Sequence, residues 1–166
     1  MADLHQLYKD DFVAWTRDQA EAIRALSPDD LPAAAARGLD LDNLAEEIES
    51  LGDSRYDALS SQMRRIIHHL LKLEFSPAEP PRNAWRRSIR EARIAAHDIL
   101  DRNPILRREV ATIAADQCRG AVKLALGDLE DHGELDKAVA GKIRARTFDL
   151  DVEILSDWMP ARRTVG

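Results

Sequence analysis

Residues 40–75 have the sequence DLDNLAEEIESLGDSRYDALSSQMRRIIHHLLKLEF, and this stretch decides the fold. Apolar residues recur in it at spacings of three and four, which is typical of an amphipathic α-helix. They occupy positions 41, 44, 48, 51, 59, 63, 66, 70 and 73. Asp40 is a good N-cap, and the apolar phase persists across Gly52. We favour one long helix that faces inward through Leu44, Ile48 and Leu51; the alternative is a break at Gly52-Asp53-Ser54.

Composition extends this prediction to the rest of the chain. Alanine and leucine dominate, whereas valine and threonine are scarce, and this balance favours helices over sheet. A length of 166 residues suits one domain. We therefore predict an all-α bundle of about six or seven helices around a long central helix (about 40–75), in a single domain over residues 1–166.

Other helices are expected on both sides of the central one. We predict them at about 8–26, 28–37, 84–102, 104–131, 134–146 and 150–158. In the first, Tyr8, Phe12 and Trp15 form a predicted core stripe, with Asp10 or Asp11 as N-cap. Three more boundaries have local signals: Asn83 as a cap, Asn103-Pro104 as a cap followed by a first-turn proline, and Gly133 as a stop. In the last, Val152, Leu155 and Trp158 are expected to dock on the bundle.

Several classes of protein are disfavoured. No apolar run approaches the ~20 residues that a membrane helix needs, so we expect no membrane association through a span. The N-terminus lacks the pattern of a secretory signal, and a single cysteine, Cys118, fits a cytoplasmic location. No dinucleotide fingerprint, phosphate loop or nucleophile elbow is present, so we expect no cofactor.

Charge is segregated along the chain. Residues 1–60 carry 14 acidic and 5 basic residues, whereas residues 61–110 carry 6 acidic and 11 basic residues. The two parts can pair within one molecule or across a homo-oligomer. The overall net charge of −6 makes a nucleic acid an unfavourable partner.

Acidic and histidine side chains in the central stretch are candidate metal ligands. Glu46, Glu47 and Glu49 form a dense run, but on a helix Glu46 and Glu47 fall on opposite flanks. His68 and His69 point about 100° apart, so they are weak candidates for one metal. A continuous helix would also place His69 about 33 Å from Glu47, at ~1.5 Å per residue. Only a hairpin at Gly52 would bring the glutamates and histidines together.

Arginines repeat along the helix expected after residue 83. The stripe follows spacings of four, four, three and four, and consists of Arg82, Arg86, Arg90, Arg93 and His97. Guanidinium groups suit both carboxylates and phosphates. We expect the stripe to pair with the acidic face around 46–57; the alternative is an external anion or nucleic acid.

The chain resembles one bacterial family, the all-helical domain of unknown function twenty-nine. The matching segments are Tyr8-x-x-Asp11-Phe12-x-x-Trp15, residues 41–52 (LDNLAEEIESLG), residues 69–72 (HLLK), Trp85 with Ile89-Arg90, and Leu155-x-x-Trp158-x-Pro160. Residues 132–150 depart from the family pattern. The resemblance implies an all-α protein without an established activity. Together with Arg86, its polar positions define a candidate binding cleft or polar network: Glu46, Glu47, Glu49, His69, Lys72, Trp85, Arg86 and Arg90.

Three functional hypotheses follow from these patterns. The leading one is a non-enzymatic helical interaction or assembly module, with a second copy or another protein as partner. The first alternative is a binder of anions or nucleic acid through the arginine stripe at 82–97. The second alternative is a metal-dependent enzyme that uses glutamate and histidine side chains.

Overall fold

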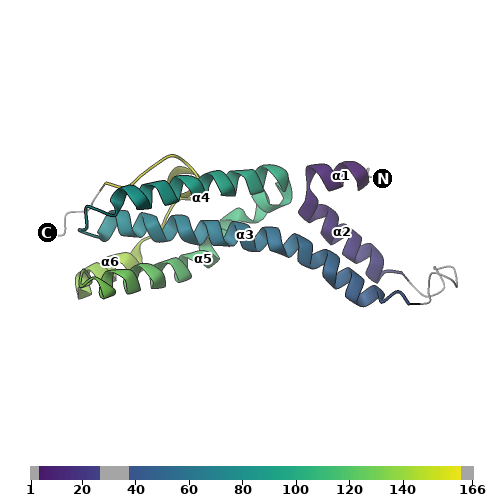
Figure 1. Ribbon diagram of the computed structural model, residues 1–166, viewed down its shortest axis with the longest axis horizontal. Helices are drawn as coiled ribbons and strands as arrows, with labels where there is room; N and C mark the ends of the chain where they lie inside the picture. Colours follow the sequence, from purple (N-terminus) through teal and green to yellow (C-terminus); the bar gives the residue numbers. More distant parts are fainter. Residues whose placement is uncertain (1–3, 27–37, 162–166) are drawn as a thin grey trace. The chain divides into compact units, whose positions relative to one another are not determined.

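A computed structural model describes residues 4–26 and 38–161 of the chain. Within these ranges the protein is all-helical, with six α-helices, one π-helical turn and no strand (Figure 1). The elements are α1 (Leu4–Asp10), α2 (Phe12–Arg24), α3 (Leu41–Phe75), α4 (Arg82–Arg102), α5 (Pro104–Asp131), α6 (Lys137–Ala145) and η2 (Leu150–Ile154). The predicted fold class is therefore confirmed, whereas the short helix predicted at 28–37 lies outside the described residues.

Helix α3 is continuous over 35 residues, and Gly52 lies inside it. Asp40 caps its N-terminus, since the Asp40 carboxylate accepts a hydrogen bond of 3.2 Å from the backbone N–H of Asn43. The prediction of one long helix is confirmed. The hairpin at Gly52 that a glutamate–histidine metal site would have required is absent.

The chain divides into two compact units. The first comprises the described residues up to Ala58 together with Ile99–Arg108, and the second comprises Leu59–Asp98 and the described residues from Glu109 onward. Helices α3, α4 and α5 each contribute to both units. The single domain over residues 1–166 stays a prediction.

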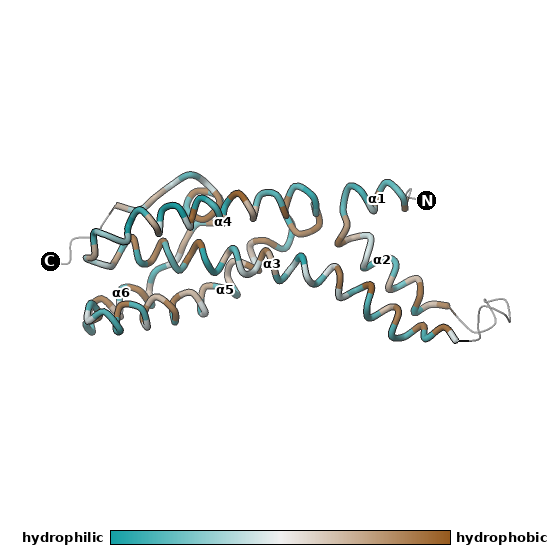
Figure 2. Tube along the Cα trace, viewed as in Figure 1, coloured by the Kyte–Doolittle hydropathy of each residue, from teal (hydrophilic) through white to brown (hydrophobic). Residues whose placement is uncertain are grey.

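In the first unit, α2 packs on the N-terminal part of α3 through small residues. A Cβ atom built on Gly52 would lie 2.3 Å from Oγ1 of Thr16, which is itself fully buried. Ala45 is also fully buried, whereas Leu44 and Leu51 are 42% and 52% exposed. The predicted inward face of Leu44 and Leu51 is wrong, because close helix–helix approach selects the neighbouring alanine and glycine positions. Figure 2 shows hydrophobic and hydrophilic residues alternating along α3.

The predicted helix at 8–26 is two helices, because the chain breaks at Asp11. Asp11 has non-helical backbone angles (φ −151°, ψ 85°) and caps α2, which confirms one of the two predicted N-caps. The aromatic residues do not form a core stripe. Tyr8 is 50% exposed, and its ring packs edge-on against Phe12 and Trp15 in a cluster at the surface. The buried residues of α2 are Val13, Thr16 and Ala20.

Two helix N-termini in the first unit cap each other. The carboxylate of Asp11 accepts hydrogen bonds from the backbone N–H of Ala14 in α2 and from that of Ile105 in α5, at 3.0 and 2.6 Å. In return, the side-chain oxygen of Asn103 accepts a bond of 3.3 Å from the N–H of Val13. Asn103-Pro104 therefore begins α5 as predicted, but the side-chain oxygen of Asn103 caps the N-terminus of α2 instead of that of α5. This exchange fixes α2 against the start of α5.

Replacing Asp11 by alanine is expected to lower the free energy of unfolding by about 2 kcal/mol, because two backbone N–H groups lose their acceptor at once. Urea denaturation followed by circular dichroism measures the loss. Asp10→Ala is the matched control, since Asp10 is exposed and its carboxylate bonds only the side chain of Gln6 among the described residues. Equal losses in the two variants would contradict the role of Asp11.

The second unit is a helical bundle built on the C-terminal part of α3. The α3 residues of its core are almost completely buried, and they are Leu59, Met63, Ile66, Ile67, Leu70, Leu71 and Leu73. Helix α4 begins at Arg82, so Asn83 lies inside it rather than capping it as predicted. Ile89, Ala92 and Ala96 are fully buried and form the inner face of α4.

The C-terminal part of this unit is less regular than predicted. Helix α6 spans only nine residues, with Asp136 as its N-cap, and the predicted helix at 150–158 is a single π-helical turn. Ile154 is buried there, whereas Val152, which we predicted to dock, is 62% exposed. Arg146 joins this segment to α3, since its guanidinium pairs with the carboxylates of Glu74 and Glu153 at 3.0 and 2.5 Å. None of the described helices is long and apolar enough to cross a membrane.

Candidate functional site

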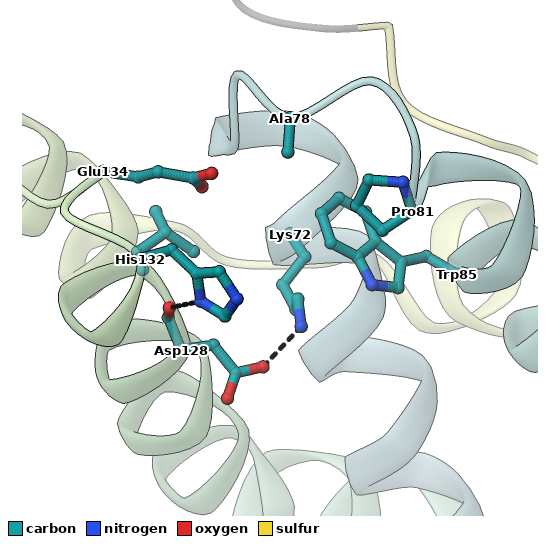
Figure 3. A pocket seen from close by; sticks show the side chains of 8 residues that line it. Lys72, Ala78, Pro81, Trp85, Asp128, His132 and Glu134 are labelled. Carbon is teal, nitrogen blue, oxygen red and sulfur yellow. Dashed lines mark hydrogen bonds and ion pairs between the residues drawn. The ribbon is translucent and has the colours of Figure 1, made fainter.

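A cavity of about 220 Å³ lies in the second unit, between the C-terminal ends of α3 and α5 and the start of α4 (Figure 3). Its wall combines apolar side chains with four ionisable groups. The lining residues are Lys72, Ala78, Pro81, Trp85, Asp128, Leu129, His132 and Glu134. The apolar body and the few converging polar groups are typical of small-ligand sites.

Lys72 is held between a carboxylate and an aromatic ring. Its ammonium donates to Oδ2 of Asp128 at 2.5 Å and lies 4.7 Å from the ring centroid of Trp85. The second contact is a cation–π interaction. The Lys72 side chain is only 13% exposed. The two partners therefore neutralise and immobilise a largely buried ammonium group.

His68 binds the same carboxylate oxygen of Asp128 through Nε2, at 2.9 Å. Burial opposes the ionisation of Asp128, but the hydrogen bond and charge of Lys72, aided by His68, outweigh it and lower the pKa of Asp128. Burial also lowers the pKa of His68, and the bond to Asp128 offsets this only in part. The site therefore keeps Asp128 ionised and His68 neutral at neutral pH.

His69 stacks on His68 with ring centroids 4.8 Å apart. Its Nδ1 atom is buried and has no hydrogen-bond partner among the described residues. Burial lowers the pKa of His69 to about 4, and the positive charges of Lys72 and Arg65, with that of His68 once it is protonated, contribute in the same direction. His69 is therefore a neutral histidine beside the cavity and does not line it.

The turn after α5 brings two more side chains to the cavity. Gly133 has a φ of 68°, which ends the helix as predicted. The N–H of Gly133 then bonds the carbonyl of Glu130, and the N–H of Glu134 bonds that of Leu129. This reversal directs the Glu134 carboxylate toward the loop that follows α3, where Ser76 Oγ donates to it at 2.6 Å.

The remaining hydrogen-bonding capacity of the cavity wall consists of acceptors. Within the part of the chain that the structure describes, no hydrogen bond reaches Oδ1 of Asp128 or Oε1 of Glu134. His132 bonds the carbonyl of Asp128 through Nδ1, so this nitrogen carries the proton and Nε2 is an acceptor in the neutral ring. With Lys72 balanced by Asp128, Glu134 leaves the wall with one excess negative charge.

The predicted cleft is divided between the two units. His69, Lys72 and Trp85 lie together in the second unit, at or beside the cavity. The glutamates lie in the first unit, where Glu46 and Glu47 are exposed and Glu49 pairs with Arg24 at 2.5 Å. Each unit therefore contributes a separate part of the predicted set.

The arginine stripe is not one exposed ridge. Arg82 is 5% exposed and donates to the carbonyls of Leu73 and Ser76, so it closes the C-terminal end of α3. Arg93 is 4% exposed and also binds backbone carbonyls. Arg86 is half-buried and Arg90 is exposed. Arg82 and Arg93 therefore bind backbone carbonyls of the second unit, which corrects the prediction that the stripe pairs as a whole with the acidic face.

No group of three or more histidine, cysteine or acidic side chains that could hold a metal ion occurs in residues 4–26 and 38–161. His68 and Asp128 form a group of only two such side chains, and the Lys72 ammonium binds the same carboxylate oxygen. The charge of the Lys72 ammonium opposes a metal cation there.

Sequence reasoning missed Asp128, His132 and Glu134. The first two are four residues apart and so share one face of α5, which was a usable signal. Nothing in the local sequence ties that face to Lys72, which is 56 positions away. Glu134 was hidden for another reason, because its position depends on the backbone reversal at Gly133.

These features define an all-helical protein with a small acceptor-rich cavity in its second unit. The chain belongs to the family described as "Domain of unknown function DUF29", whose model matches residues 7–139. It is also similar to a solved α-helical protein of unknown function from Rhodospirillum rubrum. That protein is 26% identical, with a TM-score of 0.64, and the match covers 89% of this chain and 94% of the other. The search of curated proteins gave no match.

Proposed function

We propose that the protein is a non-enzymatic binding module and that the cavity in its second unit receives an alkylammonium or guanidinium group. The observation that carries the proposal is the convergence of three unused acceptors, on Asp128, Glu134 and His132, in one wall. A cationic group with several N–H donors matches such acceptors. A cytoplasmic location and a protein partner, which the sequence led us to expect, belong to the same proposal.

The apolar part of the wall supports a cation with a short hydrocarbon stem. Ala78, Pro81 and Leu129 contribute apolar side chains to the lining. Figure 3 shows Pro81 beside the Trp85 ring, with Glu134 and His132 on the other side of the view. Long cationic side chains bury their methylene groups while the charged end keeps polar partners. A lysine or arginine side chain of a partner protein and a free amine share this chemistry.

The second unit already stabilises one ammonium in the same way. Lys72 combines a carboxylate with an indole face, and its 13% exposure shows that the site tolerates a nearly buried cation. A ligand cation would be repelled by Lys72, so Glu134, whose hydrogen-bond partner is Ser76 rather than Lys72, is its expected partner. Substitution of Glu134 is therefore the most direct test of whether the cavity binds a cation.

Titration with n-butylammonium chloride is expected to shift the indole N–H resonance of Trp85 saturably, with a Kd on the order of 1 mM. Glu134→Gln should weaken binding about tenfold, because the amide keeps the bond from Ser76 but removes the charge. Glu130→Gln is the matched control, since Glu130 is exposed and lies outside the cavity wall. Sodium butyrate should give no saturable shift.

Two further titrations separate the sources of the cation. Tighter binding of a lysine or arginine blocked at both ends than of butylammonium would point to a protein partner, and the reverse order to a free amine. The proposal fails if butyrate binds as well as butylammonium, or if Glu134→Gln and Glu130→Gln behave alike.

A further inference from the structure

A second cavity in the second unit has the opposite chemistry. It measures about 170 Å³ and lies between α4 and the segment after η2. Its lining residues are Arg90, Arg93, Ile94, His97, Leu155 and Asp157. Two guanidinium groups, of Arg90 and Arg93, and one carboxylate, of Asp157, line this wall, so the guanidinium groups outnumber the carboxylate.

Arg93 is the unusual member of this wall. Its Nε donates to the carbonyl of Ile154 at 2.8 Å, and its Nη2 donates to the carbonyls of Glu153 and Trp158 at 2.7 and 2.8 Å. These bonds hold the C-terminal segment against α4. Nη1 is buried and has no hydrogen-bond partner among the described residues. One side of a buried guanidinium is therefore left unsatisfied.

The charge of Arg93 is also uncompensated at short range. Among the residues that the structure describes, no carboxylate oxygen lies within 4.0 Å of its guanidinium nitrogens. Burial lowers the pKa of Arg93, and the more distant charge of Asp157 opposes this effect only in part. A buried cation without an ion partner is costly, and an external anion would offset that cost.

We propose that this cavity binds a small oxyanion, a carboxylate or a phosphate, between Nη1 of Arg93 and the guanidinium of Arg90. The side chain of Arg90 makes no hydrogen bond within residues 4–26 and 38–161, so it can turn to the anion at little cost. The cavity has room for about five or six water-sized groups, which matches phosphate or acetate. This site is independent of the cation cavity at Lys72.

Asp157 competes with the anion. Its carboxylate is exposed and lines the same cavity, so its negative charge repels an oxyanion. Replacing it by asparagine should therefore tighten binding rather than weaken it. If Asp157 were instead the natural partner of Arg93, its replacement would destabilise the fold and leave phosphate without effect.

The test is titration with sodium phosphate, and separately with sodium acetate, at constant ionic strength, followed by the Nε–H resonance of Arg93. We expect a saturable shift that weakens about tenfold in Arg90→Gln and tightens severalfold in Asp157→Asn. Arg87→Gln should change nothing, because Arg87 is exposed on α4 outside the cavity wall. The tighter of the two anions identifies the class of ligand.

Three results would overturn the proposal. The first is an Arg93 resonance that does not move at saturating concentrations of either anion. The second is equal weakening in Arg90→Gln and Arg87→Gln, which would indicate diffuse surface attraction. The third is an Asp157→Asn variant that is destabilised and binds no more tightly than the unmodified protein.

Discussion

Acidification from pH 7 to about pH 4 is expected to remove up to about 3 kcal/mol of stability through His69 alone. In the folded protein, burial lowers the pKa of His69 to about 4, aided by the positive charges of Lys72 and Arg65, with that of His68 once it is protonated, and opposed by Asp128. In the unfolded chain the pKa returns to about 6.5. Between these two pKa values the unfolded state binds more protons than the folded state. The free energy of the unfolded state therefore falls relative to that of the folded state as the pH falls.

The sign of this dependence is fixed by the direction of the shift. The contribution of His69 is fully present above about pH 6.5 and is lost as the pH falls through the folded pKa of about 4. His68 acts in the same direction, since burial lowers its pKa too. Asp128, whose pKa is lowered, adds to the loss only in more acidic solution.

Urea denaturation at several pH values measures the effect, with the ring protons of His69 followed by NMR as a direct titration. His69→Gln should flatten the pH dependence between about pH 6.5 and 4, because glutamine does not titrate there. His5→Gln is the control, since His5 is exposed. An unchanged pH dependence in His69→Gln would refute this account of His69.

Gly52→Ala is expected to lower the free energy of unfolding by about 2 kcal/mol, the cost of overpacking a tight contact. In an ordinary helix the same change would stabilise by ~1 kcal/mol, so the sign itself is diagnostic. The reason is that the new Cβ would lie 2.3 Å from Oγ1 of Thr16. That hydroxyl is buried and donates to the carbonyl of Val13, so it cannot move away freely.

Two variants test the cause of the loss. Gly127→Ala in α5 is the matched control, because no atom beyond its chain neighbours and the nearby backbone of its own helix lies within 4 Å of the Cβ that it adds, and it should stabilise the protein. In a Thr16→Ala background the nearest remaining Thr16 atom is the Cβ, at 3.4 Å, so Gly52→Ala should cost little there. A loss of the same size in both backgrounds would show that the Thr16 contact is not responsible.

Much of the secondary structure was predictable because its signals are local. The three- and four-residue spacing of apolar side chains predicted α3 through Gly52, and Asp40 marked its start. Asn103-Pro104 and Gly133 likewise marked the two ends of α5. Caps, turns and helical periodicity act over a few residues, so one sequence contains the information.

The packed face of a helix was harder to predict. Sequence patterning favoured Leu44 and Leu51 as the inner face of α3, but α2 packs on Ala45 and Gly52 instead. The aromatic residues of the first helical segment were misplaced for the same reason. Hydrophobicity reports what a side chain gains by burial, whereas the distance between two helices decides which side chains fit between them.

By itself, the sequence determined that the protein is all-helical and favoured a continuous α3. It also marked His69, Lys72 and Trp85 as members of a candidate binding cleft or polar network. Only the tertiary structure decided that Lys72 meets Asp128 and Trp85, that Glu134 closes the same cavity, and that Arg93 is a buried cation with one unsatisfied side. The physical reason is how far apart in the sequence the interacting residues lie. Helices form from contacts a few residues apart, whereas these sites join side chains that are far apart in sequence and meet only after the helices pack.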